Sequence, residues 1–303
     1  MKVRGSKMMC SKISKCILAA IALFLFLTAL PALAITGGEP DGDDHPYVGL
    51  IVFDVGGGPA WRCSGALIAP GVVLTAGHCT DGAVAARVWF DEIVEGNPEY
   101  PFSGGTSYDG VPYTNPDFCH TCYGKGKGLP AFSYRDVGVV VLTELVPPEV
   151  LSEYAKLPGA GLVDTLKNKT DLDLVGYGVQ EQQHGAGPPS WTGLVNRLYA
   201  PSELVSGKFV HSDEYMRVAF NPGGGTGGSC FGDSGGPDLL GGTDMVLAVN
   251  SYVTNYNCAG VGYSSRVDIP EILDWINGFS ATGAPPLRSY PRLSTTWASM
   301  KRR

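Results

Sequence analysis

The chain has 303 residues, of which 44% are hydrophobic and 17% charged, so it is not a disordered protein and can fill one large domain or two packed ones. Its charge is unevenly distributed, because residues 35–280 hold 12 cations against 29 acids, a net charge of −17, within an overall net charge of −7. So acidic a central part excludes binding to a nucleic-acid backbone through that part.

Residues 1–34 have the layout of a secretory signal peptide. A basic segment precedes an apolar run at residues 17–30, and small residues end the stretch at Ala34. A membrane span needs about 20 apolar residues, so this shorter run favours a cleaved signal over the alternative, an uncleaved anchor. We therefore expect a secreted protein, extracellular or periplasmic, without membrane contact once the signal is removed before Ile35.

From Ile35 onward, short apolar runs separated by Gly, Pro and Asp predict an all-β protein. Residues 97–134, rich in Gly, Tyr and Pro, are expected to be a surface insertion, and residues 145–165 to connect two halves. Pro270 begins a helical pattern, and residues 281–303 form a basic tail that we expect to be disordered. The expected strands are residues 47–53, 61–68, 72–75, 84–90, 137–142, 172–177, 194–199, 216–220, 245–252 and 263–267.

Cysteines in an exported chain predict disulfides when their number is even. Six remain after signal removal, and six cysteines allow about 15 pairings, so spacing alone does not choose among them. Cys119 and Cys122, with His120 between them, are alternatively half of a zinc site, but no second pair completes it. The acidic residues at 91–95 lack the ordered spacing of a calcium loop. We expect no metal and no cofactor.

Ser234 has the surroundings of a hydroxyl nucleophile, since it lies between glycines in the sequence Gly-Asp-Ser-Gly-Gly-Pro at residues 232–237. This sequence also fits the elbow of α/β-hydrolases, but that mechanism requires a histidine after the serine, and none follows Ser234. The subtilisin order would need an early aspartate such as Asp41 or Asp54 and an alternation of strands and helices that the sequence lacks.

A serine nucleophile needs a base, and the base needs an acid that orients it. His78 ends a strand-like run, and Asp136 directly precedes the apolar run at residues 137–142, so these two are the best candidates. The competing interpretations are a buried structural histidine and a turn or cap aspartate. Asp171 and Asp173 are weaker candidates for the acid.

Three motifs in this order resemble those of the trypsin/chymotrypsin-type serine proteases: residues 74–79, 135–142 and 232–237. Ile-Thr-Gly-Gly at residues 35–38 fits the front of the same family, and the resemblance runs to about Phe279. It implies a chymotrypsin-like fold, with two packed six-stranded antiparallel β-barrels and a C-terminal helix. It also implies a serine-type endopeptidase domain over residues 35–280.

The resemblance assigns roles to the site residues. His78 is the general base, Asp136 orients it, and Ser234 is the nucleophile, with the N–H groups of Gly232 and Ser234 as the oxyanion hole. The ammonium group of a freed Ile35 pairs with Asp233, so signal cleavage alone would create the activating terminus. The implied disulfides are Cys63–Cys79 and Cys230–Cys258. Cys119 and Cys122 are then left over, and we expect them to close a small local loop.

The resemblance also outlines a substrate pocket without a charged floor. Gly228 stands six residues before the nucleophile, where no carboxylate can pair with a cationic substrate, so cleavage after Lys or Arg is not expected. Val253 replaces a glycine and narrows the pocket, which favours small or medium apolar side chains. The implied pocket residues are Gly228, Ser229, Phe231, Ser251, Tyr252 and Val253.

The expected partners are protein or peptide substrates, bound by a monomer, with no nucleic acid. Two alternatives stay open at this point. One is a catalytically silent homologue that acts as a binding protein, and the other is an esterase that uses the same triad.

Overall fold

A computed structural model describes residues 35–122, 132–179, 181–183, 190–192, 195–206, 213–221 and 224–280. The expected signal peptide, the expected tail, His184 and His211 lie outside these residues. The chain divides into two units, Met1–Ala32 and Leu33–Arg303, and every described residue belongs to the second. Within the described ranges, no helix has the length and apolar character needed to cross a membrane.

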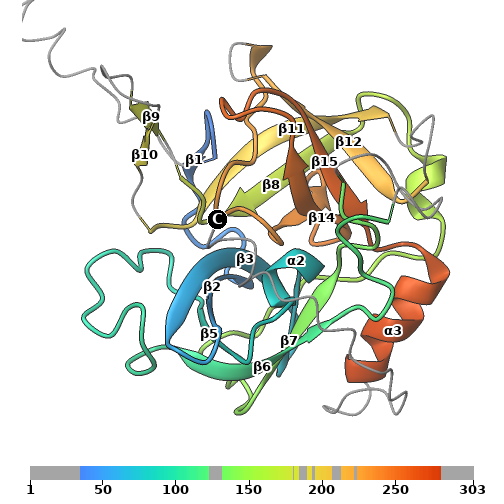
Figure 1. Cartoon of the computed structure of the whole chain (residues 1–303). Helices are drawn as coiled ribbons and strands as arrows, with labels where there is room; N and C mark the ends of the chain where they lie inside the picture. Colours follow the sequence, from blue (N-terminus) through green and yellow to red (C-terminus); the bar gives the residue numbers. More distant parts are fainter. Residues whose placement is uncertain are drawn as a thin grey trace, which may run out of the picture. The chain divides into compact units, whose positions relative to one another are not determined.

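The first half of the described chain forms a closed antiparallel barrel in the strand order β2-β3-β4-β7-β6-β5 (Figure 1). Its interior is filled by the apolar runs that predicted the strands, and the buried side chains of these strands belong to one hydrophobic core. The strands are β2 (Val48–Asp54), β3 (Pro59–Ala69), β4 (Val72–Thr75), β5 (Ala85–Trp89), β6 (Tyr108–Thr114) and β7 (Gly138–Leu142).

Strand β6 corrects the expectation that residues 97–134 are only a surface insertion. It pairs with β5 and β7 and thereby closes the barrel. Its sequence contains Asp109, Gly110 and Pro112, which are poor strand formers, so no period-2 pattern announces it. Gly110 is nevertheless required there, because a Cβ on it would lie 2.5 Å from Val140 Cγ1. Pairing with two neighbours therefore outweighs weak local propensity.

The second half forms another antiparallel barrel, closed by the pairing of β11 with β8. The prediction for residues 194–199 was wrong in extent, since the strand begins at Leu198 and continues to Ser206. Strand β13, directly after the Ser234 motif, was not predicted. The strands are β8 (Asp171–Gly176), β11 (Leu198–Ser206), β12 (Tyr215–Phe220), β13 (Pro237–Leu240), β14 (Val246–Val253) and β15 (Gly260–Arg266).

Smaller elements join or flank the barrels. They are β1 (Glu39–Pro40), which pairs with β11, the hairpin of β9 (Glu181–Gln183) and β10 (Ser190–Thr192), the one-turn helix α2 (Gly77–Thr80) and the 3-10 turn η2 (Leu162–Thr165). The predicted antiparallel two-barrel fold is confirmed.

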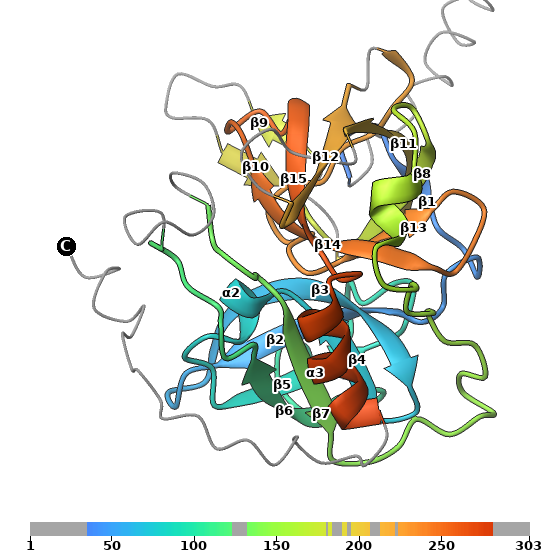
Figure 2. The ribbon, with the colours of Figure 1, turned by 90° about the vertical axis from the view of Figure 1, so that its right-hand side faces the viewer.

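The predicted C-terminal helix is confirmed as α3 (Pro270–Ser280). Its apolar face packs against the first barrel, beside β4 and β7 (Figure 2). Ile272, Ile276 and Phe279 are fully or almost fully buried, and the Phe279 ring centroid lies 5.2 Å from that of Tyr113 in β6. The last described element thus covers the barrel formed by the first ones.

The N-terminal segment precedes the first barrel in the sequence but packs into the second one. Ile35 is 1% exposed in the core of the second barrel, and Thr36 forms an antiparallel bridge with Gly228. A buried ion pair holds the segment there, with Arg197 Nε 2.6 Å from Asp41 Oδ2. The two other nitrogens of Arg197 donate to main-chain oxygens, including that of Phe90 at 2.9 Å, so each nitrogen of this buried cation has a hydrogen-bond partner.

Candidate active site

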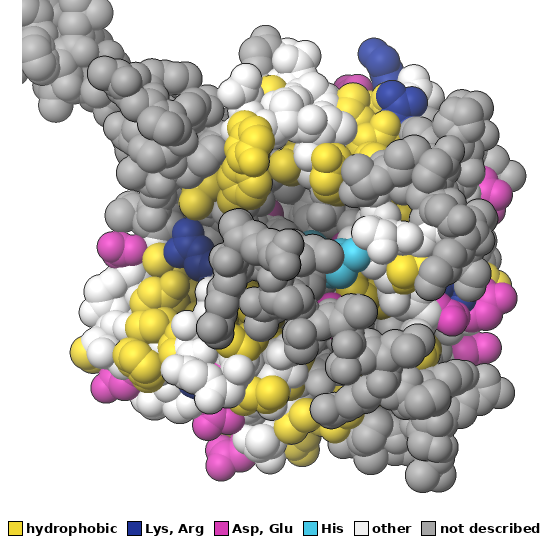
Figure 3. All heavy atoms as spheres, in the orientation of Figure 1, with side chains coloured by type: hydrophobic (Ala, Val, Ile, Leu, Met, Phe, Trp, Pro, Cys, Tyr) yellow, Lys and Arg dark blue, Asp and Glu magenta, His cyan; other side chains and the backbone are white. Residues whose placement is uncertain are grey.

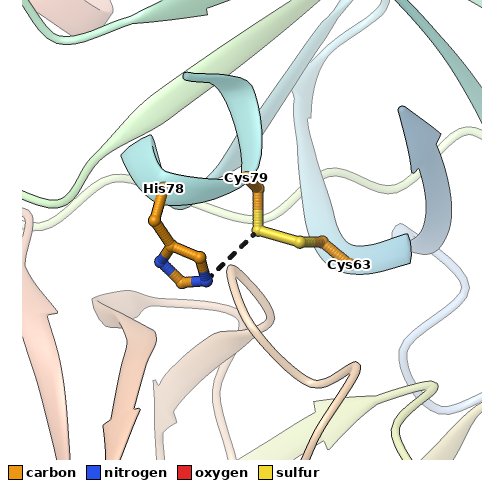
Figure 4. A group of neighbouring side chains, drawn as sticks. All are labelled: Cys63, His78 and Cys79. Carbon is orange, nitrogen blue, oxygen red and sulfur yellow. Dashed lines mark hydrogen bonds between the residues drawn. A yellow bond between two sulfur atoms is a disulfide. The ribbon is translucent and has the colours of Figure 1, made fainter. Parts of the chain in front are cut away.

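His78 is fixed at the end of β4 by a turn and a disulfide. It lies in α2, one residue before Cys79, which is bonded to Cys63. Gly77 permits this turn, because a Cβ on it would lie 2.8 Å from Phe118 Cδ2. Figure 4 shows the imidazole turned toward the disulfide, with Nε2 at 3.7 Å from Cys79 Sγ. The ring is therefore confined from two sides.

This sulfur and nitrogen cluster has the ligand types of a metal site, since donor atoms of Cys63, His78 and Cys79 lie within 4.8 Å of one another. Both sulfurs are consumed by the disulfide, however, and cannot act as thiolate ligands. The same holds for Cys119 and Cys122, which form a disulfide rather than half of a zinc site. The third disulfide is Cys230–Cys258. The two bonds that the resemblance implied and the expected local Cys119–Cys122 loop are all confirmed.

Asp136 is completely buried beneath His78 and receives three hydrogen bonds. Its Oδ1 accepts from the His78 main-chain N–H at 2.6 Å, and its Oδ2 lies 2.7 Å from His78 Nδ1. Ser251 Oγ donates to Oδ2 at 2.6 Å. These bonds fix Nδ1 as the protonated nitrogen, which leaves Nε2 free to accept a proton.

The Asp136 carboxylate and the His78 imidazolium stabilise each other's charged form. Burial acts to raise the pKa of Asp136, but the His78 charge and the hydrogen bonds from His78 and Ser251 outweigh it and hold the pKa below its usual range. Burial likewise acts to lower the pKa of His78, and Asp136 raises it to a net value above the ordinary one. Asp136 is therefore an anion that strengthens His78 as a base.

Ser234 lies in a tight turn between β12 and β13. Gly235 has φ 78°, and a Cβ on it would lie 2.1 Å from Thr75 Oγ1, so only glycine fits beside the serine. The Ser234 carbonyl accepts the Ser64 N–H at 2.8 Å, which fixes the turn against β3. Ser234 and His78 line one pocket of about 470 Å³. Among the described residues, no hydrogen bond joins Ser234 Oγ to His78 Nε2.

Two main-chain donors beside the nucleophile are unused. Within the described part of the chain, neither the Gly232 N–H nor the Ser234 N–H donates to another protein group. Gly232 has φ 100°, and its carbonyl is held by Ser64 Oγ at 3.0 Å, so the peptide orientation is fixed. Unpaired N–H groups at a partly buried turn are ready to bind an anionic oxygen.

Asp233 is a buried carboxyl that lacks a cationic partner in direct contact among the described residues. Its oxygens accept the N–H groups of Gly178 and Cys230, both at 2.8 Å. Burial raises its pKa to about 7, against the effect of these two bonds. Gly176 and Gly178 make room for it, because a Cβ on either would lie 2.3 Å from a carboxylate oxygen. Ile35 is buried in the same barrel.

The pocket differs in part from the one expected. The lining includes Ser229, Phe231 and the end of β14 at Ser251, Tyr252 and Val253, as the resemblance implied. Gly228 is not part of the lining and instead lies against Phe220. Four further lining groups could not be predicted from local sequence, because strand ends and loops from separate regions bring them together. These are Phe220, Asn250, Cys230 and residues 254–256.

The other histidines and aspartates considered have different partners. His45 Nδ1 lies 2.6 Å from Asp41, and His120 Nε2 lies 3.9 Å from Asp81. Asp173 accepts hydrogen bonds from the Tyr199 hydroxyl and a main-chain N–H. Among the three described histidines, His78 alone lines a pocket with a serine nucleophile candidate.

Acidic side chains lie mainly toward the margin of the face shown in Figure 3, whereas hydrophobic side chains reach nearer to its centre. Glu92 and Glu95 belong to the acidic residues at 91–95. Their side chains accept hydrogen bonds from the main-chain N–H groups of Gly42 and Val195 at 2.9 and 3.0 Å. Their oxygens thus tie loops together rather than converge on one point.

Comparisons with known proteins agree with the fold and the motifs. The family described as Trypsin matches residues 35–276. Serine protease 1 of Drosophila melanogaster is 25% identical over 244 residues, covering 80% of this chain and 84% of that protein. Proproteinase E of Bos taurus is 26% identical over 267 residues, covering 82% and 95%.

Solved structures show the same architecture at lower identity. HL collagenase has a TM-score of 0.58 at 20% identity, over 79% of this chain and 94% of that one. Human heparin binding protein has a TM-score of 0.57 at 17% identity, over 82% and 98%. At these identities the likeness concerns the fold alone.

Proposed function

This chain belongs to the trypsin family of serine proteases, and from that premise we propose that it is a serine endopeptidase acting through His78, Asp136 and Ser234. The observation that carries the proposal is the buried carboxylate of Asp136, which binds His78 Nδ1 at 2.7 Å, while His78 and Ser234 line the same pocket. Bonds between nucleophile and base are often long without substrate, so the missing Oγ–Nε2 hydrogen bond is compatible with this role.

In the proposed mechanism, His78 Nε2 takes the Ser234 hydroxyl proton as Oγ attacks the substrate carbonyl carbon. The Gly232 and Ser234 N–H groups donate to the oxyanion that forms, and removal of one such donor typically costs about 10²–10³ in rate. His78 then passes its proton to the leaving amine, and an ester to Ser234 remains. Water, deprotonated by His78, hydrolyses that ester. Asp136 keeps its charge throughout and stabilises the imidazolium.

We also propose that cleavage before Ile35 activates the protein. A carboxyl as buried as Asp233 is costly to ionise without a cation, and a new ammonium group at Ile35 would supply one within the same barrel. The Thr36–Gly228 bridge already holds the segment beside the loop that carries the nucleophile. Secreted, active protein whose N-terminal sequence began at any residue other than Ile35 would contradict this.

The expected export, monomeric state and protein or peptide substrates are part of the same proposal. Three disulfides suit an oxidising compartment, since thiols are kept reduced in the cytosol. A substrate that is extended across the pocket would meet the exposed rings of Phe231, Tyr252 and Tyr256, which belong to its lining.

A fluorophosphonate probe tests the proposed function against a silent homologue. Wild-type protein should be labelled, Ser234→Ala should not, and Ser152→Ala, which removes an exposed serine elsewhere, should be labelled like wild type. Casein and short acyl esters should then be compared, because an esterase would cleave only the esters. Absence of labelling of the folded wild-type protein, or casein left intact, would refute the endopeptidase proposal.

A further inference from the structure

Phe220 is a buried residue that lines the pocket containing Ser234. It is the last residue of β12 and is only 2% exposed, yet it is part of the pocket lining. The rest of its surface belongs to the core of the second barrel, together with Ile35, Ala200 and Val218. A ring packed in this way has little freedom to move aside when a substrate side chain enters.

Two glycines make room for this ring. A Cβ on Gly262 would lie 2.0 Å from Phe220 Cζ, and a Cβ on Gly228 would lie 2.7 Å from Phe220 Cβ. Gly262 pairs with Val253 across β14 and β15, so the ring lies over the strand next to the pocket wall. The space that glycines at these two positions would otherwise leave open is therefore occupied by Phe220.

The remaining lining offers no carboxylate partner for a cationic side chain. None of the residues that line the pocket is acidic. Two buried polar side chains of the lining bind each other and the main chain, with Ser229 Oγ 2.5 Å from Asn250 Oδ1 and Asn250 Nδ2 3.1 Å from the Gly236 oxygen. A buried cation without a partner is strongly disfavoured, so lysine and arginine side chains are excluded.

We infer that Phe220 sets the depth of the pocket, so that the protein cleaves after small aliphatic residues such as alanine and valine. This inference rests on the proposed function and identifies the determinant of its specificity. A substrate phenylalanine would compete with the Phe220 ring for one volume. Even one misplaced methylene in an apolar pocket changes kcat/KM by about 10–200-fold, and an aromatic ring exceeds that.

The test uses exported, full-length protein and peptide nitroanilides that differ only in the residue before the scissile bond: Ala, Val, Phe or Lys. Wild type should cleave after Ala or Val with kcat/KM at least about 100 times that for Phe or Lys. Phe220→Ala should raise the Phe-to-Ala ratio of kcat/KM by at least about 100-fold. Phe102→Ala, which truncates an exposed ring outside the pocket, should keep the wild-type ratios.

The outcomes separate this inference from the proposed function. Wild type that cleaves mainly after Phe or Lys overturns the inference and leaves the endopeptidase intact, whereas failure to cleave any peptide or to react with fluorophosphonate refutes the endopeptidase itself. A folded Phe220→Ala protein with unchanged ratios shows that another residue sets the depth. If that variant does not fold, Phe220→Leu replaces it, and an unchanged Phe-to-Ala ratio there also overturns the role of Phe220.

Discussion

Asp238→Asn should stabilise the protein at neutral and alkaline pH, because ionisation of Asp238 opposes folding. The side chain is completely buried in β13, a strand of the second barrel. Among the described residues, neither carboxylate oxygen accepts a well-directed hydrogen bond. Burial raises the pKa of Asp238 to about 7, although the nearby Ser264 hydroxyl works against this. Asparagine keeps the shape and removes the charge.

The size of the effect follows from proton linkage. Asp238 loses its proton at its ordinary pKa of 3.8 in the unfolded chain but only at about 7 in the fold, so stability is lost as pH rises between these values. Their separation of about 3 pH units corresponds to about 4 kcal/mol. The melting temperature of Asp238→Asn should thus exceed that of wild type by roughly 10 °C at pH 8, and by almost nothing at pH 4.

Differential scanning calorimetry of both proteins from pH 4 to pH 8 measures this difference directly. Asp44→Asn, which neutralises an exposed carboxylate, serves as the control and should follow wild type at every pH. Other carboxylates titrate equally in all three proteins, so only the difference between the curves counts. A difference that stays constant with pH, or a lower melting temperature of Asp238→Asn at pH 8, would show that ionisation of Asp238 does not destabilise the folded protein.

Three further substitutions test the active site and the buried ion pair of Arg197 and Asp41. The kcat/KM should decrease as the pH falls below the pKa of His78. Burial lowers this pKa, but Asp136 raises it to a net value above 6.5. Asp136→Asn should shift this fall in pH–rate profiles to lower pH and reduce kcat by about 10⁴. Ser251→Ala removes one donor to Asp136 and should reduce kcat about tenfold with unchanged KM, in steady-state kinetics. Arg197→Met removes the guanidinium group from buried Asp41, which keeps only the His45 ring as a side-chain partner, and should cost about 3–5 kcal/mol in urea unfolding, whereas adding Asp41→Leu should restore most of that.

Much of the fold was predictable because its strands are strongly apolar. Runs such as residues 72–75 and 137–142 are buried on both faces, so their hydrophobicity alone distinguishes them. β6 and β13 were not predictable in this way, because Asp, Gly and Pro interrupt β6 and Pro and Asp begin β13, and each is stabilised by pairing with two neighbouring strands. Local composition carries no information about such partners.

The same distinction applies to the candidate site. His78, Asp136 and Ser234 stand in motifs with strict local requirements, such as the glycine turn at Gly235, and these are readable from the sequence. The Phe220 ring fits in its place only because glycines, which have no side chain, stand at positions distant in the sequence, one of which is Gly262. No spacing rule relates them, so the depth of the pocket emerged only from the structure.

The crossing of the two chain ends has a consequence for how the protein is made. Ile35 completes the core of the second barrel, and Phe279 of α3 completes that of the first. The first barrel cannot bury its full core before Phe279 has left the ribosome, and the second barrel cannot do so without Ile35. A nascent or truncated chain therefore exposes apolar surface in both halves. Each barrel therefore depends on the other for completion, and the pair should melt in a single calorimetric transition.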